Sequence, residues 1–381
     1  MQTRKLYYED PYRQDFRGKV LSCEQVKNGW AVVLDATAFF PEEGGQTADT
    51  GTLAGARVLD AHEKAGVITH LTDGPVPVGV TVEGHIDWPD RYRKMQNHTG
   101  EHVVSGLVYG KYGFDNVGFH LGSDGCTVDF SGELTREQLN EIEREANAVV
   151  WRNVPVEVRF PRWSELEKME YRSKLDLKED VRIVTIPGVD RCACCAPHVS
   201  NTGQIGLIKI LDFMRHRGGV RIWMKSGADA LADYGDRYEA ALAVSGMLNT
   251  PQADIAAGVE KLLAQRDALK FELTALRREM AQAKAAALEA AEGNILVFFQ
   301  SDEDGMRTLV NAGMEKCGGV CAVFSGEDGA YRFVMGSKTV DMRAFMKENG
   351  PALKARGGGQ AQMVSGRSTA TKAELEAFFQ L

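Results

Sequence analysis

The sequence has no long hydrophobic run, and this absence excludes two classes of protein. No stretch approaches the roughly 18 consecutive apolar residues that a membrane-spanning helix needs. The first ten residues, MQTRKLYYED, contain no apolar region of the kind found in a signal peptide. Neither a membrane-spanning protein nor one with a secretory leader is therefore expected.

Cysteine is scarce and unevenly placed, which argues against a secreted protein held together by disulfides. The chain has seven cysteines, an odd number, and three of them are Cys192, Cys194 and Cys195. A disulfide framework would spread its cysteines along the chain. We therefore expect a cytoplasmic protein with reduced thiols.

An excess of positive charge is also missing, because the formal net charge is −8. This balance argues against a protein that coats nucleic acid without selectivity. Two local basic stretches, 205–225 and 332–372, can still bind a polyanion through a few phosphates; the alternative is that they are solvated surfaces. The candidate residues for such phosphate contacts are Lys209, Arg215, Arg217, Arg221, Lys354 and Arg356.

The 381 residues are enough for several domains, and the pattern predicts an α+β protein with four parts. Residues 1–88 consist of short strands and glycine-bearing turns, which predict a small N-terminal β-barrel. Residues 89–240 mix strands and helices without strict alternation and contain the candidate site. Residues 241–293 predict a long coiled-coil-like helix, and residues 294–381 predict a C-terminal α/β domain.

The long helix is predicted to run from Pro251 to Ala291, with Thr250 as its N-cap. Its apolar residues follow alternating four and three spacings, with one lapse at Arg266. Such a helix can separate two domains, pair with a second chain, or do both. A homodimer through this helix or through the C-terminal domain is the oligomer that the pattern allows.

Two short segments carry side chains that suit a metal ion. Residues four apart share one face of a helix, so His98 and His102 can direct their imidazoles at one point. Cys194 and His198 have the same spacing about ninety residues downstream. Three imidazoles and one thiolate form a ligand set that suits zinc, so the two segments together predict a zinc site.

Two alternatives to this site stay open at the level of sequence. Cys192 and Cys195 are competing thiols, and the choice of sulfur ligand depends on the spacing alone. The segment His98–His102 also matches H-x-x-E-H, a metalloprotease signature with Glu101 as base and Glu179 as a conceivable third ligand. Such a protease does not need the Cys/His segment.

Four motifs, in this order, resemble the freestanding alanyl-tRNA editing proteins of the AlaX type in their long form. They are TAFFPEEGGQ at 37–46, QNHTGEHVVS at 96–105, CCAPHVSNTGQIG at 194–206 and GVRI at 219–222. The C-terminal unit resembles the DHH-associated domain at the end of alanyl-tRNA synthetase. The match spans nearly the whole sequence.

The resemblance implies a trans-editing hydrolase, an aminoacyl-tRNA deacylase that removes serine, and often glycine, from tRNA(Ala). It implies that no aminoacylation domain precedes the barrel. It aligns Thr37 with a threonine proposed to recognise the serine hydroxyl, and Gln46 with a loop glutamine near the acceptor end. It also implies one zinc ion per chain, with the ligands His98, His102, Cys194 and His198.

The chain departs from the family between the sulfur ligand and His198. Where the family has Gly-Gly-Thr, this chain has Cys195-Ala196-Pro197, so one backbone donor is lost and one bulky side chain is added. A different activity or specificity, or a non-catalytic tRNA-binding protein, is the expectation that follows from this departure. The candidate catalytic residues are Thr37, Gln46 and Glu101.

Overall fold

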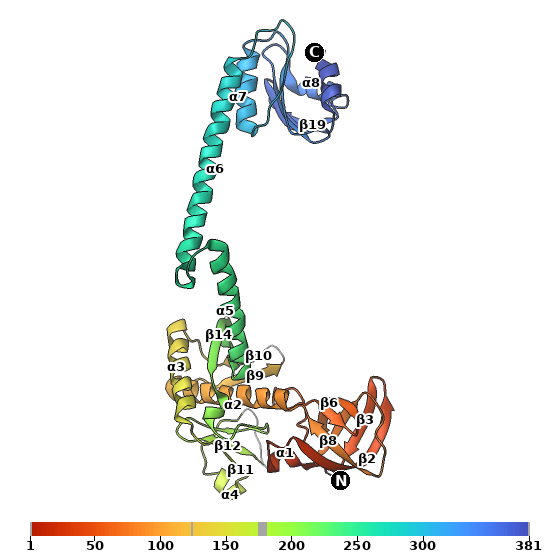
Figure 1. Ribbon diagram of the computed structural model, residues 1–381, viewed down its shortest axis with the longest axis vertical. Helices are drawn as coiled ribbons and strands as arrows, with labels where there is room; N and C mark the ends of the chain where they lie inside the picture. The colour runs from red at the N-terminus through yellow and green to blue at the C-terminus, as the bar shows by residue number, and fades with distance from the viewer. Residues whose placement is uncertain (1, 123–124, 174–180, 380–381) are drawn as a thin grey trace. The chain divides into compact units, whose positions relative to one another are not determined.

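The computed structural model describes residues 2–122, 125–173 and 181–379, and the predicted α+β class is confirmed. Tertiary contacts divide the chain into two compact units, Met1–Ala241 and Leu242–Leu381 (Figure 1). The finer division at residues 88, 240 and 293 stays a prediction. Among the described residues, no helix combines the length and the apolar character needed to cross a bilayer.

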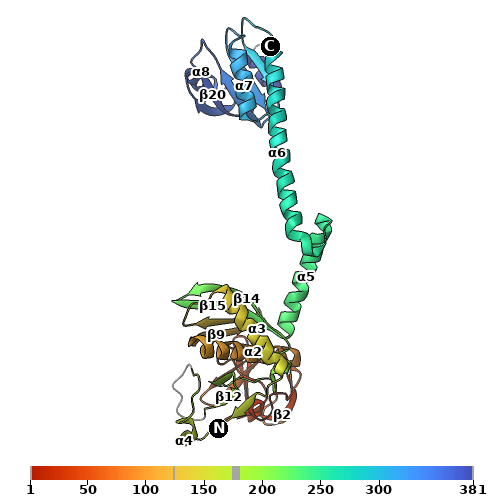
Figure 2. The same cartoon turned by 90° about the vertical axis from the view of Figure 1, so that its left-hand side faces the viewer.

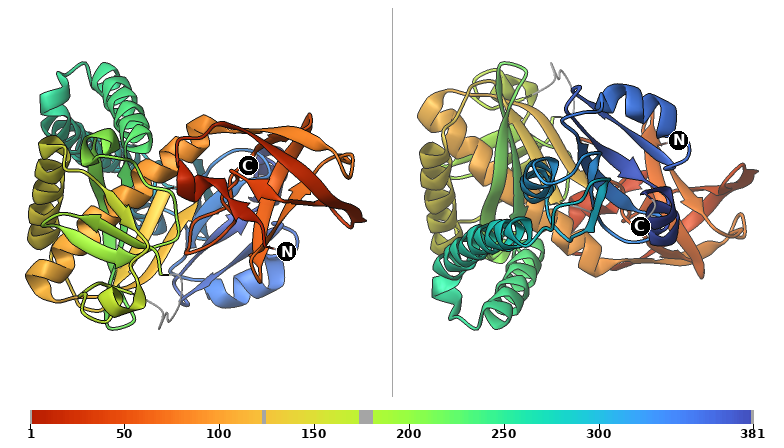
Figure 3. Two further views of the ribbon diagram at one scale, coloured as in Figure 1. Left: turned by 90° about the horizontal axis from the view of Figure 1, so that it is seen from below. Right: turned by 90° about the horizontal axis from the view of Figure 1, so that it is seen from above.

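The first unit begins with six strands that close into a barrel, in the order β2-β3-β7-β6-β5-β8 (Figure 3). Burial alternates along these strands, so every second side chain points into the barrel core, as Val82 and Ile86 do. A short helix, α1 (Leu6–Glu9), precedes the barrel. The barrel strands are β2 (Asp15–Val26), β3 (Gly29–Leu34), β5 (Gly51–Leu53), β6 (Ala56–Lys64), β7 (Val67–Thr72) and β8 (Thr81–Ile86).

The helix α2, Trp88–Tyr112, is the element around which the rest of the first unit packs (Figures 1 and 2). It begins with Pro89 in its first turn and ends at Gly113, whose φ of 70° is the left-handed conformation common at helix ends. It contacts α3, strands β9, β10 and β15 of one sheet, and β13 of another. Because α2 is covered on several sides, its polar residues need partners inside the protein.

Two antiparallel sheets and one further helix complete this unit. The four-stranded sheet has the order β14-β15-β10-β9, and the three-stranded sheet has the order β11-β12-β13. These elements are β9 (Asn116–Gly122), β10 (Gly125–Phe130), α3 (Arg136–Arg152), β11 (Glu157–Arg159), β12 (Ile183–Ile186), β13 (Asp190–Ala193), β14 (Ile208–His216) and β15 (Gly219–Ser226). The segment that follows β13 runs beside α2 and carries Cys194 and His198.

Thr135 caps α3 through a reciprocal pair of hydrogen bonds. The Gln138 N–H donates to the Thr135 hydroxyl at 3.3 Å, and the Thr135 N–H donates to the Gln138 side chain at 2.8 Å. Replacing Thr135 with alanine is expected to lower the free energy of unfolding by about 1 kcal/mol, measured by urea titration. Thr135→Ser keeps the acceptor and is the control; equal loss in both variants would contradict the capping role.

The long helix differs from its prediction at both ends. It is α6, Ile255–Ala286, and not Pro251–Ala291, and Thr250 does not cap it. The preceding helix, α5 (Ala228–Leu248), ends where Asn249 adopts a φ of 48°. Pro251 has a ψ of 148°, outside the helical region, so only a short 3-10 turn precedes α6. The apolar side chains spaced along α6 are exposed to solvent, namely Leu262, Leu269, Leu273, Leu276 and Met280.

The second unit also contains a five-stranded sheet in the order β16-β17-β18-β20-β19. β16 and β17 are parallel, and the other neighbouring pairs are antiparallel. The core of this unit is a cluster of aromatic and methionine side chains that includes Phe324, Phe333 and Met335. Its elements are β16 (Ile295–Phe298), α7 (Glu303–Met314), β17 (Cys321–Ser325), β18 (Tyr331–Gly336), α8 (Met342–Asn349), β19 (Ala355–Gly359), β20 (Met363–Ser368) and α9 (Lys372–Phe379).

Candidate metal centre and its cavity

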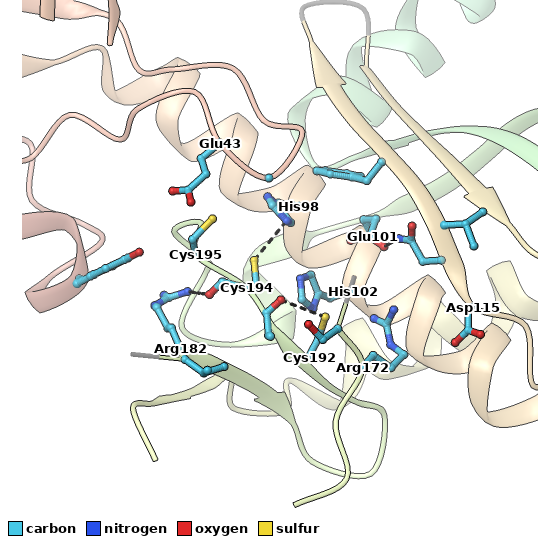
Figure 4. Close-up of a pocket in the computed structure, with 18 of the residues that line it drawn as sticks. Glu43, His98, Glu101, His102, Asp115, Arg172, Arg182, Cys192, Cys194 and Cys195 are labelled. Carbon is cyan, nitrogen blue, oxygen red and sulfur yellow. Dashed lines mark hydrogen bonds between the residues drawn. The ribbon is translucent and has the colours of Figure 1, made fainter. Parts of the chain in front are cut away.

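Four side chains from two remote segments meet at one point, and Figure 4 shows three of them, His98, His102 and Cys194. His98 and His102 come from α2, and Cys194 and His198 come from the segment after β13. One nitrogen or sulfur atom of each lies within 4.8 Å of the corresponding atoms of the others. Cys194 Sγ lies 3.6 Å from His98 Nε2 and 3.3 Å from His198 Nε2. The structure thus brings together the residues that the two spacings pair.

Two of the imidazole rings are fixed from behind by an acceptor at Nδ1. His98 Nδ1 lies 2.8 Å from Gln46 Oε1, and His102 Nδ1 lies 2.9 Å from Asp190 Oδ2. Both partners are acceptors, so Nδ1 of each ring carries the proton and donates. A neutral ring protonated at Nδ1 presents its lone pair at Nε2, on the side of the four-residue cluster.

The third ring is fixed in the same way through a hydroxyl group. Thr99 donates its hydroxyl proton to the carbonyl of Met95 at 2.7 Å. The Thr99 oxygen, 3.0 Å from His198 Nδ1, is therefore left as an acceptor for that ring. All three imidazoles thus have the tautomer in which Nε2 can bind a cation.

The electrostatics of the cluster suit a cation as well. Burial raises the pKa of the Cys194 thiol, but His98 and His198 lower it by more, so the pKa lies well below its usual range. Burial lowers the pKa of His198 to about 3. Burial also lowers the pKa of His102, yet Asp190, Cys194 and Cys192 together raise it by more, so that a metal would displace a proton there. Three imidazoles and one thiolate at this spacing fit a tetrahedral zinc ion.

A cavity of about 830 Å³ opens onto three of these side chains, His98, His102 and Cys194. α2 and β9 form one side of it, the loop before Gln46 contributes another, and β13 with the segment that follows it forms a third (Figure 4). Cavities of this size are typical of small-molecule sites. The lining residues that matter below are Lys5, Tyr8, Glu101, Asn116, Arg172 and Arg182.

Glu101 lies in this cavity, between the two histidines of α2 in the sequence (Figure 4). Its side chain is only 3% exposed. The amide of Asn116 donates to Glu101 Oε1 at 2.6 Å, and the Ser105 hydroxyl donates to the same oxygen. Two donors on one oxygen fix the orientation of the Glu101 side chain.

Gln46 contacts a residue of the metal cluster, whereas Thr37 lies away from the cavity. Gln46 is buried behind His98, and its Nε2 atom has no hydrogen-bond partner among the described residues. Thr37 is the last residue of β4 (Ala36–Thr37), is fully buried and is not part of the cavity lining. Its hydroxyl donates to His70 Nε2 at 2.9 Å and accepts from the Phe39 N–H at 3.2 Å. Both hydrogen bonds of the Thr37 hydroxyl are therefore made inside the protein, and the structure does not bring this group to the cavity.

Asp190 and Arg172 are functional candidates that the sequence did not reveal. Arg172 Nε and Nη2 donate to the two oxygens of Asp190, each at 2.8 Å, while Asp190 also accepts from His102. Burial raises the pKa of Asp190, but His102 and Arg172 lower it by more, so the carboxylate is ionised. The one signal in the sequence is an aspartate two residues before Cys192; the partner arginine gives none.

The departure at Cys195-Ala196-Pro197 lies against the loop that contains Gly44. A Cβ atom at Gly44 would lie 3.4 Å from Cys195 Sγ, and burial raises the pKa of the Cys195 thiol well above its usual range. The Arg182 guanidinium donates to the carbonyls of Cys194 and Ala196, each at 2.8 Å. The added thiol is therefore buried against this loop, and Arg182 binds the same segment through two of its carbonyls.

Glu179, the third ligand of the metalloprotease alternative, lies outside the described residues.

The predicted tRNA contacts are not part of the cavity lining. Four lie on or between β14 and β15, and three of these are paired with carboxylates, which reduces their net positive potential. The pairs are Lys209 with Glu143 at 2.7 Å, Arg215 with Glu133 at 3.1 Å and Arg221 with Asp129 at 2.6 Å. Arg217 occupies the hairpin turn with a φ of 47°. In the second unit, Lys354 pairs with Glu374 at 2.7 Å, and Arg356 is on β19.

Replacing Gln46 with leucine is expected to lower the affinity for zinc by roughly tenfold to a hundredfold. Leucine removes the acceptor at His98 Nδ1, so the ring is free to rotate or change tautomer. The affinity is measured by competition with a chromogenic chelator. Gln46→Glu keeps an acceptor and is the control; an unchanged affinity in Gln46→Leu would contradict the orienting role.

Two family models match parts of the chain. The "Threonyl and Alanyl tRNA synthetase second additional domain" matches residues 181–223, a range that contains both Cys194 and His198. The "tRNA synthetases class II (A)" model matches residues 12–90.

Relatives are similar over much greater lengths. The alanyl-tRNA editing protein AlaX-L of Pyrococcus horikoshii is 28% identical over 98% of this chain and 96% of its own. The alanine–tRNA ligases of Halorubrum lacusprofundi and Natronomonas pharaonis are 32% and 34% identical over 88% and 90% of this chain. The chain spans only 38% and 39% of these ligases. A solved C-Ala domain of Aquifex aeolicus alanyl-tRNA synthetase aligns with 24% of the chain at 21% identity, with a TM-score of 0.21 that is too low to assign a shared fold.

Proposed function

We propose that this chain, which belongs to the family of alanyl-tRNA editing proteins of the long AlaX type, is an aminoacyl-tRNA deacylase. The substrate is tRNA(Ala) charged with serine, and also with glycine, and the reaction is hydrolysis of the ester. The observation that carries this proposal is the convergence of three oriented imidazoles and one thiol beside a cavity. A structural zinc site in an RNA-binding protein is closed, whereas this cluster opens onto a cavity.

The proposed cofactor is one zinc ion, held by side chains whose geometry and protonation suit it. When bound, zinc supplies polarisation of an ester carbonyl and a lower pKa for a water molecule. The residues that would hold it are His98, His102, Cys194 and His198, and those that orient the rings are Gln46, Asp190 and Thr99.

Glu101 is the proposed general base. Asn116 and Ser105 occupy one of its oxygens, which leaves Oε2 to accept a proton from the attacking water. The water oxygen forms a bond to the carbonyl carbon, and the bond from that carbon to the ribose oxygen breaks. Glu101 then returns the proton to the ribose oxygen, which yields free amino acid and uncharged tRNA.

The proposed partner is tRNA(Ala). We propose that basic residues remote from the cavity, on the β14–β15 hairpin and in the second unit, contact the tRNA. They are Lys209, Arg215, Arg217, Arg221, Lys354 and Arg356. A homodimer through the exposed apolar side of α6 is part of the same proposal.

The test is to incubate the protein with Ser-, Gly- and Ala-tRNA(Ala) and follow release of the amino acid. We expect loss of the seryl and glycyl esters, slower loss of the alanyl ester, and inhibition by a chelator that added zinc reverses. An unchanged ester in all three substrates would contradict hydrolysis and leave only the binding alternatives.

A further inference from the structure

A second cavity, of about 370 Å³, shares a wall with the first. Tyr8 and Arg182 line both cavities. The second is also lined by Arg159 at the end of β11 and by Phe160, which follows it. All these residues belong to the first unit.

Aromatic and cationic side chains lie next to one another along this wall. The rings of Tyr8 and Phe160 meet edge to face with centroids 5.5 Å apart, and the Arg182 guanidinium lies 5.2 Å from the centre of the Tyr8 ring. Lys5 Nζ approaches the same ring at 5.3 Å. Phe160 is 52% exposed, so part of its ring is open to a further stacking partner.

Lys5 is paired with Glu63 at 2.8 Å, so the positive charge that this wall offers to a ligand comes from its two arginines. Arg182 is only 6% exposed, its described hydrogen bonds go to two carbonyls, and its Nε has no partner among the described residues. Arg159 has a single distant ion pair, 3.8 Å from the Glu157 carboxylate. Glu9, which also lines the second cavity, is already neutralised by Arg4 at 2.6 Å.

We propose that the second cavity binds the unpaired nucleotides at the 3′ end of the tRNA. A base stacks on Phe160, and Arg159 and Arg182 contact the phosphates. Proteins bind single-stranded nucleic acid by stacking bases on exposed aromatic rings beside cationic side chains. The inference depends on the proposed function, because an ester on the terminal ribose must enter the first cavity while the preceding nucleotides lie just outside it.

The test measures binding and requires no hydrolysis. An uncharged, fluorescent RNA hairpin with four unpaired 3′ nucleotides, ACCA, is compared with the same hairpin with a blunt end. Phe160→Ala is expected to bind the overhang hairpin about tenfold more weakly. Arg159→Ala is expected to make the dependence of log affinity on log salt shallower by about 0.7 for one lost phosphate contact. Trp151→Ala and Arg152→Ala are matched exposed controls outside both cavities and are expected to bind like the unmodified protein.

The outcomes separate this inference from the proposed function. Equal binding of both hairpins by the unmodified protein, or unchanged binding and salt dependence in Phe160→Ala and Arg159→Ala, overturns the inference even if seryl-tRNA is hydrolysed. Overhang-dependent binding that both variants lose supports the inference even if no ester is cut, in which case the proposed deacylase activity fails alone. Zinc content is measured in every variant and is expected to be unchanged.

Discussion

Cys194→Ala is expected to lose zinc and, with it, hydrolysis of Ser-tRNA(Ala) by about a thousandfold or more. Cys194 supplies the only sulfur in the group of four, and its Sγ lies 3.3 Å from His198 Nε2. Removing it leaves three neutral imidazoles, which bind zinc more weakly than a set with a thiolate. The contribution of a bound divalent ion to an ester hydrolysis is several kcal/mol, which corresponds to that loss of rate. Zinc content and single-turnover deacylation are the measurements.

Cys195→Ala is the matched control for this prediction, because its thiol is adjacent in sequence but packs toward Gly44. It is expected to keep its zinc. The same pair of variants tests the metalloprotease alternative, which needs no sulfur ligand. Zinc retained in Cys194→Ala, or lost from Cys195→Ala instead, would contradict the ligand assignment.

Asp190→Ala is expected to have the second largest effect, on stability and on metal binding together. Its side chain is 2% exposed, and it is the acceptor for both His102 and Arg172. The substitution leaves a guanidinium that is only 12% exposed without its carboxylate, which costs about 3 kcal/mol of unfolding free energy. It also frees the His102 ring, which lowers the affinity for zinc by roughly tenfold to a hundredfold.

The stability of Asp190→Ala is measured by urea unfolding of metal-free protein, so that lost zinc binding does not add to the difference. Asp129→Ala is the control, since Asp129 makes the same two-pronged contact with Arg221 at a partly exposed site. There we expect a loss below about 1 kcal/mol. Equal losses in the two variants would show that burial of the Asp190 network has no special effect.

Most of what the sequence could predict about the site follows from the four-residue spacing of its ligands. The interval of four residues puts His98 and His102 on one side of a helix whatever surrounds it, and the structure has that helix. The pairing with Cys194 and His198 could be proposed because the two half-sites are chemically complementary. The hydrogen bonds that orient the His102 ring could not be predicted, because Arg172 and Asp190 are brought together only by the packing of β13 against a preceding loop.

The role expected of Thr37 depends on contacts that its motif does not contain. The Thr37 hydroxyl forms a hydrogen bond with His70, thirty-three residues away, and nothing in the sequence predicts that contact. The end of the long helix shows a similar limit. Thr250 and Pro251 have the composition of a helix start, yet Asn249 in the left-handed conformation ends α5 there and α6 begins only at Ile255.

The most direct test of the central claim is an anomalous difference map from crystals, recorded on both sides of the zinc absorption edge. The account predicts one peak in the first unit, about 2.0–2.1 Å from Nε2 of the three histidines and about 2.3 Å from Cys194 Sγ. The absence of a peak there in protein purified without chelators, or a peak at other residues, would contradict it.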